Sequence, residues 1–480
     1  MDMLIDGGWT GASDGAVDPV LNPANDEQIA TVPRATLADV SRAVSAAQRG
    51  RQAMSVLPAW RRSEILEAVA RRIEANHEEL GRLLCRENGK RIGETTSEVR
   101  VAARIFRGYA EEAKRIFGKS VPLDSVPGRE QSLAITMRQP LGVIVAIVPF
   151  NYPVELWSHK VAGGLAAGNA VITKTPEDCP LAVIEIARYV DEAGLPHGGH
   201  QLLTGGHDVG EALVRAEGVQ MIAMTGSTAA GRRILEVAAQ TLKKVHLELG
   251  GNDATIVCGD ADIEATAEAL IGGRFTSGNG QICCAVKRVL VDRAIYPSLL
   301  DAVIARTSKL KLGDPMNPST DIGPLINRRG AERVEAQVRQ AVTDGATVVT
   351  GGKRHDNFFE PTILTGVTPG TPAFADETFG PVLPLIPFDN FNEALALAND
   401  SPFGLQAALF TRDLARVMHA YQVLDVGTVV INHTTAIRIE TLPFGGNKAS
   451  GNGREGIHDT LHEMTKEKTL LLHDVFGGGG

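Results

Sequence analysis

From Gly142 onward, short apolar segments alternate with helical ones, and this rhythm limits the possible folds more than any other feature. Gly142 to Val148 is uninterrupted apolar sequence, as expected for a strand covered on both faces. The helical segment Leu181 to Ala193 stops at Gly194, which a proline follows two residues later. Further short strands are predicted at residues 170–173, 201–203, 220–224 and 244–247. The alternation predicts an α/β fold with a parallel, doubly wound sheet.

The chain is long enough for more than one such unit. Its 480 residues exceed one ordinary core, so two or three domains are expected. Residues from about Leu37 to Phe117 carry apolar positions at helical spacing and are predicted to be helices. A second series of strands and helices runs from about Gly251 to Gly451, so a boundary is expected just after Glu248.

Charge and cysteine content argue against several classes of protein. The formal net charge is −9 and no long basic run is present, which argues against nucleic acid as a partner. No apolar run approaches the roughly 20 residues that span a membrane. The five cysteines lack the paired spacing of a metal site or of a disulfide framework. We therefore expect no metal site and a cytoplasmic protein with reduced thiols.

One cysteine follows a glycine-rich turn. Gly278 and Gly280 precede Cys283, and such a turn can present a sulfur to a cleft. A thiolate attacks carbonyl carbon readily near neutral pH, so Cys283 is a candidate nucleophile. A buried, inert thiol is the commoner role of a cysteine. We keep that interpretation for the isolated residues Cys85, Cys179 and Cys258.

Two further residues complete a candidate catalytic set. Glu248 ends an apolar strand, where a carboxylate can accept a proton from a thiol or from water. Asn151 follows another buried strand, and its amide could stabilise an oxyanion. Each also has an ordinary explanation, because most glutamates are solvated and asparagine is common in turns.

Three segments could bind a dinucleotide. Lys174 and Glu177 follow a strand and could hold ribose hydroxyls by charge-assisted hydrogen bonds. Gly226 and Ser227 lie between a strand and a helix, where backbone N–H groups can meet a pyrophosphate. The segment Glu377–Pro381 could supply a carboxylate and an aromatic ring near the second ribose.

Together and in this order, these segments resemble the aldehyde dehydrogenase superfamily across nearly the whole chain. The matching segments are Pro149–Phe150–Asn151, Lys174 with Glu177, Gly226–Ser227 with Gly231, Glu248–Leu249–Gly250–Gly251, Gly280–Gln281 with Cys283, Glu377 with Phe379–Gly380–Pro381, and residues 443–455. Each match is modest alone, but seven in register make chance agreement negligible.

The resemblance implies catalytic roles. Cys283 would be the nucleophile and Glu248 the general base. The side-chain amide of Asn151 and the backbone N–H of Cys283 would form the oxyanion hole. Lys160 stands where the family has a lysine on a proton route, and Glu455 matches a second family carboxylate. The implied reaction passes through a thiohemiacetal and a thioester on Cys283, and water activated by Glu248 releases the acid.

The resemblance also implies NAD as the cofactor, with NADP possible. The implied cofactor contacts are Pro149, Lys174, Glu177, Gly226, Ser227, Leu249, Glu377 and Phe379. A carboxylate at Glu177 would hydrogen-bond the 2′-hydroxyl of NAD and repel the 2′-phosphate of NADP. Lys174 nearby would soften that repulsion.

The implied architecture has three parts: a Rossmann-like cofactor domain, an α/β catalytic domain and a small β arm. The assigned ranges are 1–118 with 140–248 for the cofactor domain, 249–450 for the catalytic domain, and 119–139 with 451–480 for the oligomerisation arm and C-terminal segment. Thr469–Leu472 would suit a strand that pairs across a subunit interface. A homodimer or homotetramer is therefore expected.

For the substrate, the chain most resembles the branch with lactaldehyde, non-phosphorylating glyceraldehyde-phosphate and succinate-semialdehyde dehydrogenases. Phosphate-handling members place arginine just before the catalytic cysteine, and Ile282 stands there in this chain. This departure argues against a phosphorylated substrate. The first expectation is a short hydroxyaldehyde such as lactaldehyde or glycolaldehyde. A small anionic aldehyde, such as succinate semialdehyde or sulfolactaldehyde, is the alternative.

The expected substrate contacts are Arg107, Tyr152, Ile282, Cys284 and Arg438. Either arginine could hold a carboxylate, sulfonate or phosphate by bidentate hydrogen bonds. A surface arginine paired with a carboxylate such as Glu440 is an equally good interpretation of each.

Two functions from other classes fit these residues less well. A CoA-acylating dehydrogenase of this fold would pass the acyl group to a thiol, but such enzymes commonly lack the glutamate base that Glu248 supplies. A structural descendant without activity would have no reason to keep Cys283, Glu248 and Asn151 together.

Overall fold

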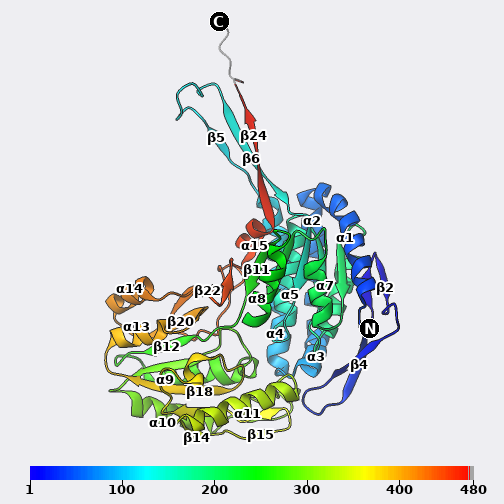
Figure 1. The fold of residues 1–480 in the computed structure, drawn as a ribbon. Helices are drawn as coiled ribbons and strands as arrows, with labels where there is room; N and C mark the ends of the chain where they lie inside the picture. Colours follow the sequence, from blue (N-terminus) through cyan, green and yellow to red (C-terminus); the bar gives the residue numbers. More distant parts are fainter. Residues whose placement is uncertain (474, 476–480) are drawn as a thin grey trace.

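The computed structural model describes residues 1–473 and 475, and it is built around two large sheets (Figure 1). The first sheet has eight strands in the order β2-β1-β9-β8-β7-β10-β11-β23. Their bounds are β1 (Met3–Ile5), β2 (Gly8–Thr10), β7 (Val143–Ile147), β8 (Ala170–Lys174), β9 (His200–Leu203), β10 (Met221–Thr225), β11 (Lys244–Glu248) and β23 (Gly451–Asn452). The five central strands are parallel, so the predicted doubly wound sheet is confirmed.

Helices cover both faces of this sheet. They are α1 (Leu37–Val56), α2 (Ala59–Ala75), α3 (His77–Asn88), α4 (Ile92–Glu112), α5 (Pro153–Ala166), α6 (Leu181–Glu192), α7 (His207–Arg215) and α8 (Thr228–Ala239). Alternate residues of β7 face opposite sides, as strand geometry requires. Ile144 and Ala146 pack with α2 to α6, whereas Val143 and Val145 pack with α1, α7 and α8. Burial on both faces explains why this strand is apolar throughout.

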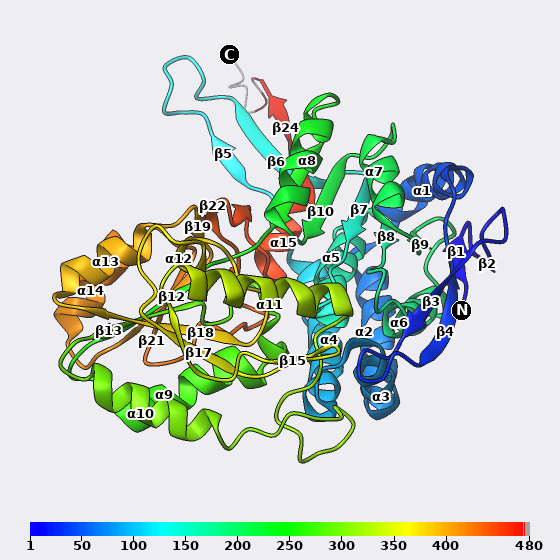
Figure 2. The ribbon, with the colours of Figure 1, turned by 60° about the horizontal axis from the view of Figure 1, so that its bottom comes forward.

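The second sheet has seven strands in the order β14-β17-β18-β13-β12-β20-β21. Their bounds are β12 (Ala254–Val257), β13 (Arg288–Asp292), β14 (Thr347–Thr350), β17 (Thr362–Thr365), β18 (Val382–Phe388), β20 (Gln406–Phe410) and β21 (Thr428–Ile431). The helices around it are α9 (Ile263–Ile271), α10 (Tyr296–Thr307), α11 (Arg328–Thr343), α12 (Pro372–Ala375), α13 (Phe391–Asn399) and α14 (Leu414–Val423). Helices α9 and α10 pack on one face of this sheet, and α11, α13 and α14 pack on the other (Figure 2).

A three-stranded arm projects from the body in the order β24-β6-β5 (Figure 1). Its strands are β5 (Ser120–Pro122), β6 (Leu133–Pro140) and β24 (Thr465–Leu472), and α15 (Ile457–Glu463) leads into the last of them. Antiparallel pairing runs from Thr465 opposite Pro140 to Leu472 opposite Leu133. Of the expected segment 451–480, positions 474 and 476–480 lie outside the described residues.

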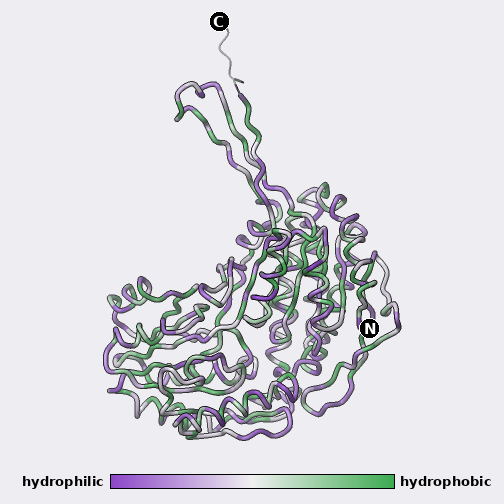
Figure 3. The backbone as a smooth tube through the Cα atoms, viewed as in Figure 1, coloured by the Kyte–Doolittle hydropathy of each residue, from purple (hydrophilic) through white to green (hydrophobic). Residues whose placement is uncertain are grey.

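The remaining elements are short. They are the pairs β3 (Val17–Leu21) with β4 (Gln28–Pro33), β15 (Arg354–His355) with β16 (Phe358–Phe359) and β19 (Phe403–Gly404) with β22 (Asn447–Lys448), and single helical turns at Ala113–Arg115, Gly272–Thr276 and Gly278–Gly280. Apolar residues concentrate where strands and helices meet, and polar ones on outer turns (Figure 3). Within the described part of the chain, no helix combines the length and apolar character needed to cross a membrane.

Candidate active site

The carboxyl ends of the first sheet's parallel strands gather most of the residues singled out in the sequence. Strand order places β10 beside β7, while β8 and β9 lie on the other side of β7. The crevice at such a switch in strand order is where open α/β sheets bind ligands. Asn151 follows β7, Lys174 ends β8, Ser227 follows β10 and Glu248 ends β11. Parallel pairing therefore brings four residues from distant parts of the chain to one edge.

The cysteine segment enters from the second sheet through an unusual turn. Gly278, Asn279 and Gly280 have φ angles of 54°, 51° and 76°, so three successive residues adopt the left-handed region. A side chain at Gly280 would place its Cβ 2.5 Å from the carbonyl carbon of Gly380, so glycine is required there. Cys283 follows this turn and is half-buried, whereas Cys284 is buried.

Asn279, which we did not single out from the sequence, holds this turn. Its side chain is fully buried, and its amide group donates to the carbonyls of Gly89 and Pro324, at 3.0 Å each. Its carbonyl oxygen accepts from the backbone N–H of Gly323 at 2.9 Å. Asparagine tolerates the left-handed region better than other side chains, which is the one available sequence signal.

A cavity of about 170 Å³ opens at Cys283. Of the residues expected to contact substrate, it is lined by Tyr152, Ile282, Cys284 and Arg438, and Asn151 is also part of the lining. The side-chain amide of Asn151 hydrogen-bonds no group among the described residues, so its N–H remains free for a ligand. The pKa of the half-buried Tyr152 is raised well above its usual value by desolvation and by Glu94, so this phenol stays protonated.

Arg107 does not reach this cavity. Its guanidinium pairs with Glu74 at 2.7 Å and with Glu67 at 3.5 Å, both on α2. One turn earlier on α4, Arg104 lines the cavity and pairs with Glu440 at 2.7 Å. We therefore replace Arg107 with Arg104 as the candidate at the mouth. Helical periodicity alone does not show whether Arg104 or Arg107 forms ion pairs with the carboxylates of α2.

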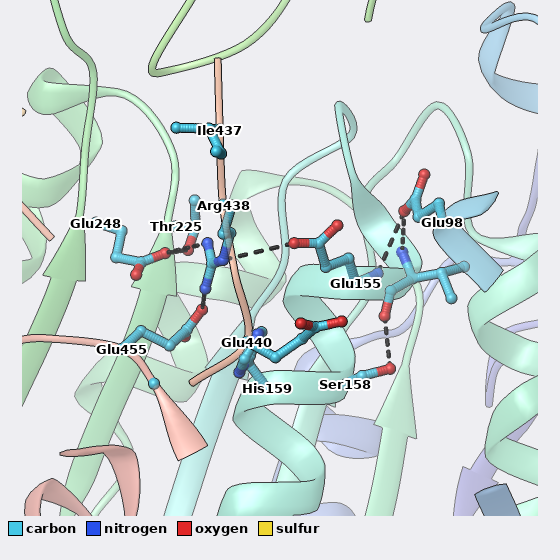
Figure 4. A network of polar contacts seen from close by, with 12 residues as sticks. Glu98, Glu155, Ser158, His159, Thr225, Glu248, Ile437, Arg438, Glu440 and Glu455 are labelled. Atoms are coloured by element: carbon cyan, nitrogen blue, oxygen red, sulfur yellow. Dashed lines mark hydrogen bonds and ion pairs between the residues drawn. The ribbon is translucent and has the colours of Figure 1, made fainter. Parts of the chain in front are cut away.

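Buried charges surround Glu248 (Figure 4). One carboxylate oxygen of Glu248 accepts from the hydroxyl of Thr225 at 2.9 Å, and it lies 3.7 Å from Arg438 and 3.9 Å from Lys160. The other oxygen is buried with no hydrogen-bond partner among the described residues. Glu455 pairs with Arg438 and, at 2.7 Å, with Lys160. The alternative that Arg438 is a surface residue paired with Glu440 is therefore wrong, because Arg438 is largely buried and pairs with Glu455.

Arg438 joins the network to the cavity. It lies 3.5 Å from Glu155 and stacks on the ring of Phe444, with 4.5 Å between guanidinium and ring centre. Burial alone would raise the pKa of Glu455, but Lys160 and Arg438 outweigh it and hold that pKa far below its usual range. At Glu155, burial prevails over Arg438 and raises the pKa to about 7.

An apolar slot beside Lys174 fits an adenosine. A cavity of about 250 Å³ between α7 and α8 is lined by Lys174, Glu177 and apolar side chains, among them Val214, Ile234 and Val237. The ammonium of Lys174 lies 3.6 Å from the carboxylate of Glu177. Burial lowers the pKa of Lys174, so a nearby anion or hydroxyl acceptor is favourable for it.

The residues expected beside the rest of a dinucleotide lie along the same edge. Ser227 is the N-cap of α8, and its hydroxyl accepts from the N–H of Ala230, so other first-turn N–H groups remain for a phosphate. Gly226 and Leu249 follow β10 and β11, and Pro149 lies just beyond β7. Phe379 packs edge-on against Phe150, with ring centres 5.8 Å apart, and Glu377 precedes it by two residues. The donors and the slot therefore fit a nicotinamide dinucleotide.

A comparison with known protein families decides the assignment, because a model described as the aldehyde dehydrogenase family matches residues 9–470. The chain belongs to this family. This aldehyde dehydrogenase is 40% identical over 472 residues to a 3-sulfolactaldehyde dehydrogenase of Priestia aryabhattai, with 98% of each chain covered. It is therefore an oxidoreductase that acts on aldehydes with NAD(P), as the motifs predicted.

Solved structures agree with the fold. The crystal structure of a succinate-semialdehyde dehydrogenase from Burkholderia pseudomallei matches this aldehyde dehydrogenase with a TM-score of 0.95 at 37% identity, over 98% of each chain. An NADP-dependent enzyme of E. coli matches with a TM-score of 0.95 at 36% identity, again over 98% of each chain. The predicted fold class is thereby confirmed.

Proposed function

We propose that this aldehyde dehydrogenase oxidises a small anionic aldehyde, bearing a carboxylate or a sulfonate, to the corresponding acid. Arg104 at the mouth of the Cys283 cavity is the observation that carries the proposal. The relatives named for sulfolactaldehyde and succinate semialdehyde support it. Neutral hydroxyaldehydes, the first expectation from the sequence, become the second candidate.

The two arginines of the cavity differ in how freely they can exchange partners. The side chain of Arg104 is 57% exposed, whereas that of its partner Glu440 is 18% exposed. Because the arginine end of this pair is open to solvent, a substrate anion can approach Arg104 and compete with Glu440 for it. Arg438 is 13% exposed and faces three carboxylates. We assign it a supporting role, in which it orients Glu248 and Glu455 and contributes positive potential behind the substrate.

In the proposed reaction, Cys283 acts as the nucleophile. Its thiolate attacks the aldehyde carbon, and the amide of Asn151 with the backbone N–H of Cys283 stabilises the resulting oxyanion. Lys174, Glu177, Ser227 and Glu377 would hold NAD(P), which when bound would supply the hydride acceptor.

Hydrolysis of the Cys283 thioester is assigned to Glu248. Its buried oxygen without a hydrogen-bond partner among the described residues supports this role, in which it would accept a proton from water that attacks the thioester and releases the acid. Lys160 lies 3.9 Å from Glu248 and pairs with Glu455, and we assign it to the route by which that proton leaves.

We also propose a homo-oligomer assembled through the arm and a cytoplasmic location. The strand β24 exposes Leu470 and Leu471 by 52% and 60%, as expected of a surface that a second copy covers. All five cysteines are free, which fits a reducing compartment.

The substrate class is tested by kcat/KM with NAD for succinate semialdehyde and 3-sulfolactaldehyde against lactaldehyde and propanal. We expect Arg104→Met to lower kcat/KM for the anionic pair about tenfold or more, and to leave the neutral pair nearly unchanged, because only the anions lose a charged partner. Arg107→Met, on the same helix, is the matched control and should alter neither. A higher kcat/KM for the neutral pair in the wild type would overturn the proposal.

A further inference from the structure

A buried ammonium group joins the three segments that the reaction uses. Lys287 lies just before β13, and its side chain is 1% exposed. Its Nζ donates to the carbonyl of Gly251 at 3.1 Å, to the carbonyl of Cys283 at 3.4 Å and to Glu377 at 2.6 Å. These acceptors belong to the segment after the general base, to the nucleophile segment and to the cofactor-binding loop.

The three contacts fix the ammonium in place. A lysine side chain has three donors and no acceptor, so one acceptor from each segment uses all of them. A buried charge without such partners is costly. Moving any one of the three segments away would leave the ammonium with an unsatisfied donor, so the contact resists such movement. The Cys283 carbonyl is also closely packed, since a Cβ at Gly251 would lie 2.6 Å from its oxygen.

The contact with Glu377 leaves that carboxylate with one oxygen engaged and one available. Oε1 accepts from Lys287 and from the backbone N–H of Gly251 at 3.2 Å. Oε2 takes no hydrogen bond from any described residue. A Cβ added at Gly250 would lie 2.3 Å from this Oε2 atom. Glycine at that position thus makes room for a carboxylate whose orientation Lys287 sets.

We propose that Lys287 is a positioning residue, which orients Glu377 toward the nicotinamide ribose and keeps the Cys283 segment in register with it. The inference rests on the proposed roles of Cys283 and Glu377 and is independent of the choice of aldehyde. Lys287 touches neither substrate nor reacting atoms, and its effect passes through these two residues.

The first test is NAD binding to the free enzyme by titration calorimetry, without aldehyde. We expect Lys287→Met to raise the Kd for NAD about tenfold, because Glu377 loses its orienting partner. Glu377→Gln should raise it similarly, and the double variant should be no weaker than Glu377→Gln alone. Lys353→Met, at an exposed lysine of the same domain, should leave the Kd unchanged.

Several outcomes would overturn the proposal. An unchanged Kd in Lys287→Met would show that the pair does not orient Glu377, and additive losses in the double variant would show that the two residues act separately. Lys287→Gln, which keeps a neutral donor of similar length, serves if the methionine variant does not fold and should also bind NAD more weakly. With NAD saturating, the single-turnover hydride-transfer rate should fall as well; an unchanged rate would refute the link to Cys283.

Because binding is measured without substrate, a wrong substrate class leaves the first test intact. The Arg104 experiment can fail while the Kd shifts as expected, and the reverse can also occur. The two proposals are therefore separable.

Discussion

At the scale of single residues, Glu155 makes the cavity sensitive to pH. It lines the space in front of Cys283, and burial raises its pKa to about 7, with Arg438 opposing the shift. Below that pH the side chain is protonated and neutral. Above it, a second negative charge faces the substrate beside Glu440.

We expect KM for an anionic aldehyde to rise as the pH rises through about 7, because ionised Glu155 repels the substrate anion. The measurement is KM as a function of pH between about pH 6 and pH 8.5, a range in which the carboxylate of succinate semialdehyde and the sulfonate of 3-sulfolactaldehyde both stay ionised. Propanal, which has no charge, should show no such rise and is the control. Glu155→Gln should flatten the profile for the anion; a wild-type slope in that variant would assign the effect to another group.

Residues whose chemistry is local could be proposed as site candidates from the sequence, and residues whose role depends on distant partners could not. Cys283, Glu248 and Asn151 stand at strand ends or after a glycine turn, where the motif itself is visible. Lys287 was missed because its three acceptors come from segments up to 90 residues away. Arg107 was proposed and Arg104 was missed for the same reason, since carboxylates on another helix hold Arg107 away from the cavity.

At the scale of elements, the five central strands of the first sheet were predicted to within one residue at either end, because burial on both faces leaves a continuous apolar run. The two-residue strand β23 was not predicted. Its residues, Gly451 and Asn452, carry no strand signal, and their place beside β11 depends on backbone pairing over some two hundred residues of chain.

The turn before Cys283 is expected to tolerate substitution poorly, because its residues are buried. Asn279→Ala removes three buried hydrogen bonds and puts alanine in the left-handed region. At roughly 1 kcal/mol for each bond, we expect about 3 kcal/mol less stability and a slower reaction of Cys283 with iodoacetamide. Denaturant unfolding measures the first effect. Asn317→Ala, at an exposed turn, is the control, and equal losses in both variants would contradict the role given to Asn279.

At the scale of the whole molecule, the arm carries a strand with one edge unpaired within the described chain. Strand β24 bonds to β6 on one side only and exposes Leu470 and Leu471. Edge strands of this kind pair readily with another chain. An isolated arm that protrudes from the body would otherwise leave apolar surface in water (Figure 1).

We expect Leu471→Asp to shift the protein toward smaller species, because a buried charge weakens an apolar subunit contact. Size-exclusion chromatography with light scattering measures the mass over a range of concentrations. Val342→Asp, at an exposed apolar position outside the arm, should leave the mass unchanged. A monomeric wild type at all concentrations would contradict the homo-oligomer.

The placement of β23 bears on how the enzyme is made. The strand that carries Glu248 receives its outer neighbour from residues 451–452, after the whole second sheet has been synthesised. The backbone N–H of Leu249 likewise donates to the carbonyl of Ser450, which is synthesised some two hundred residues later. The strands that line the proposed nucleotide slot are therefore synthesised well before the neighbours of the strand that carries Glu248. Premature termination before residue 450 yields a chain in which this strand lacks both its outer neighbour and the carbonyl that pairs with Leu249.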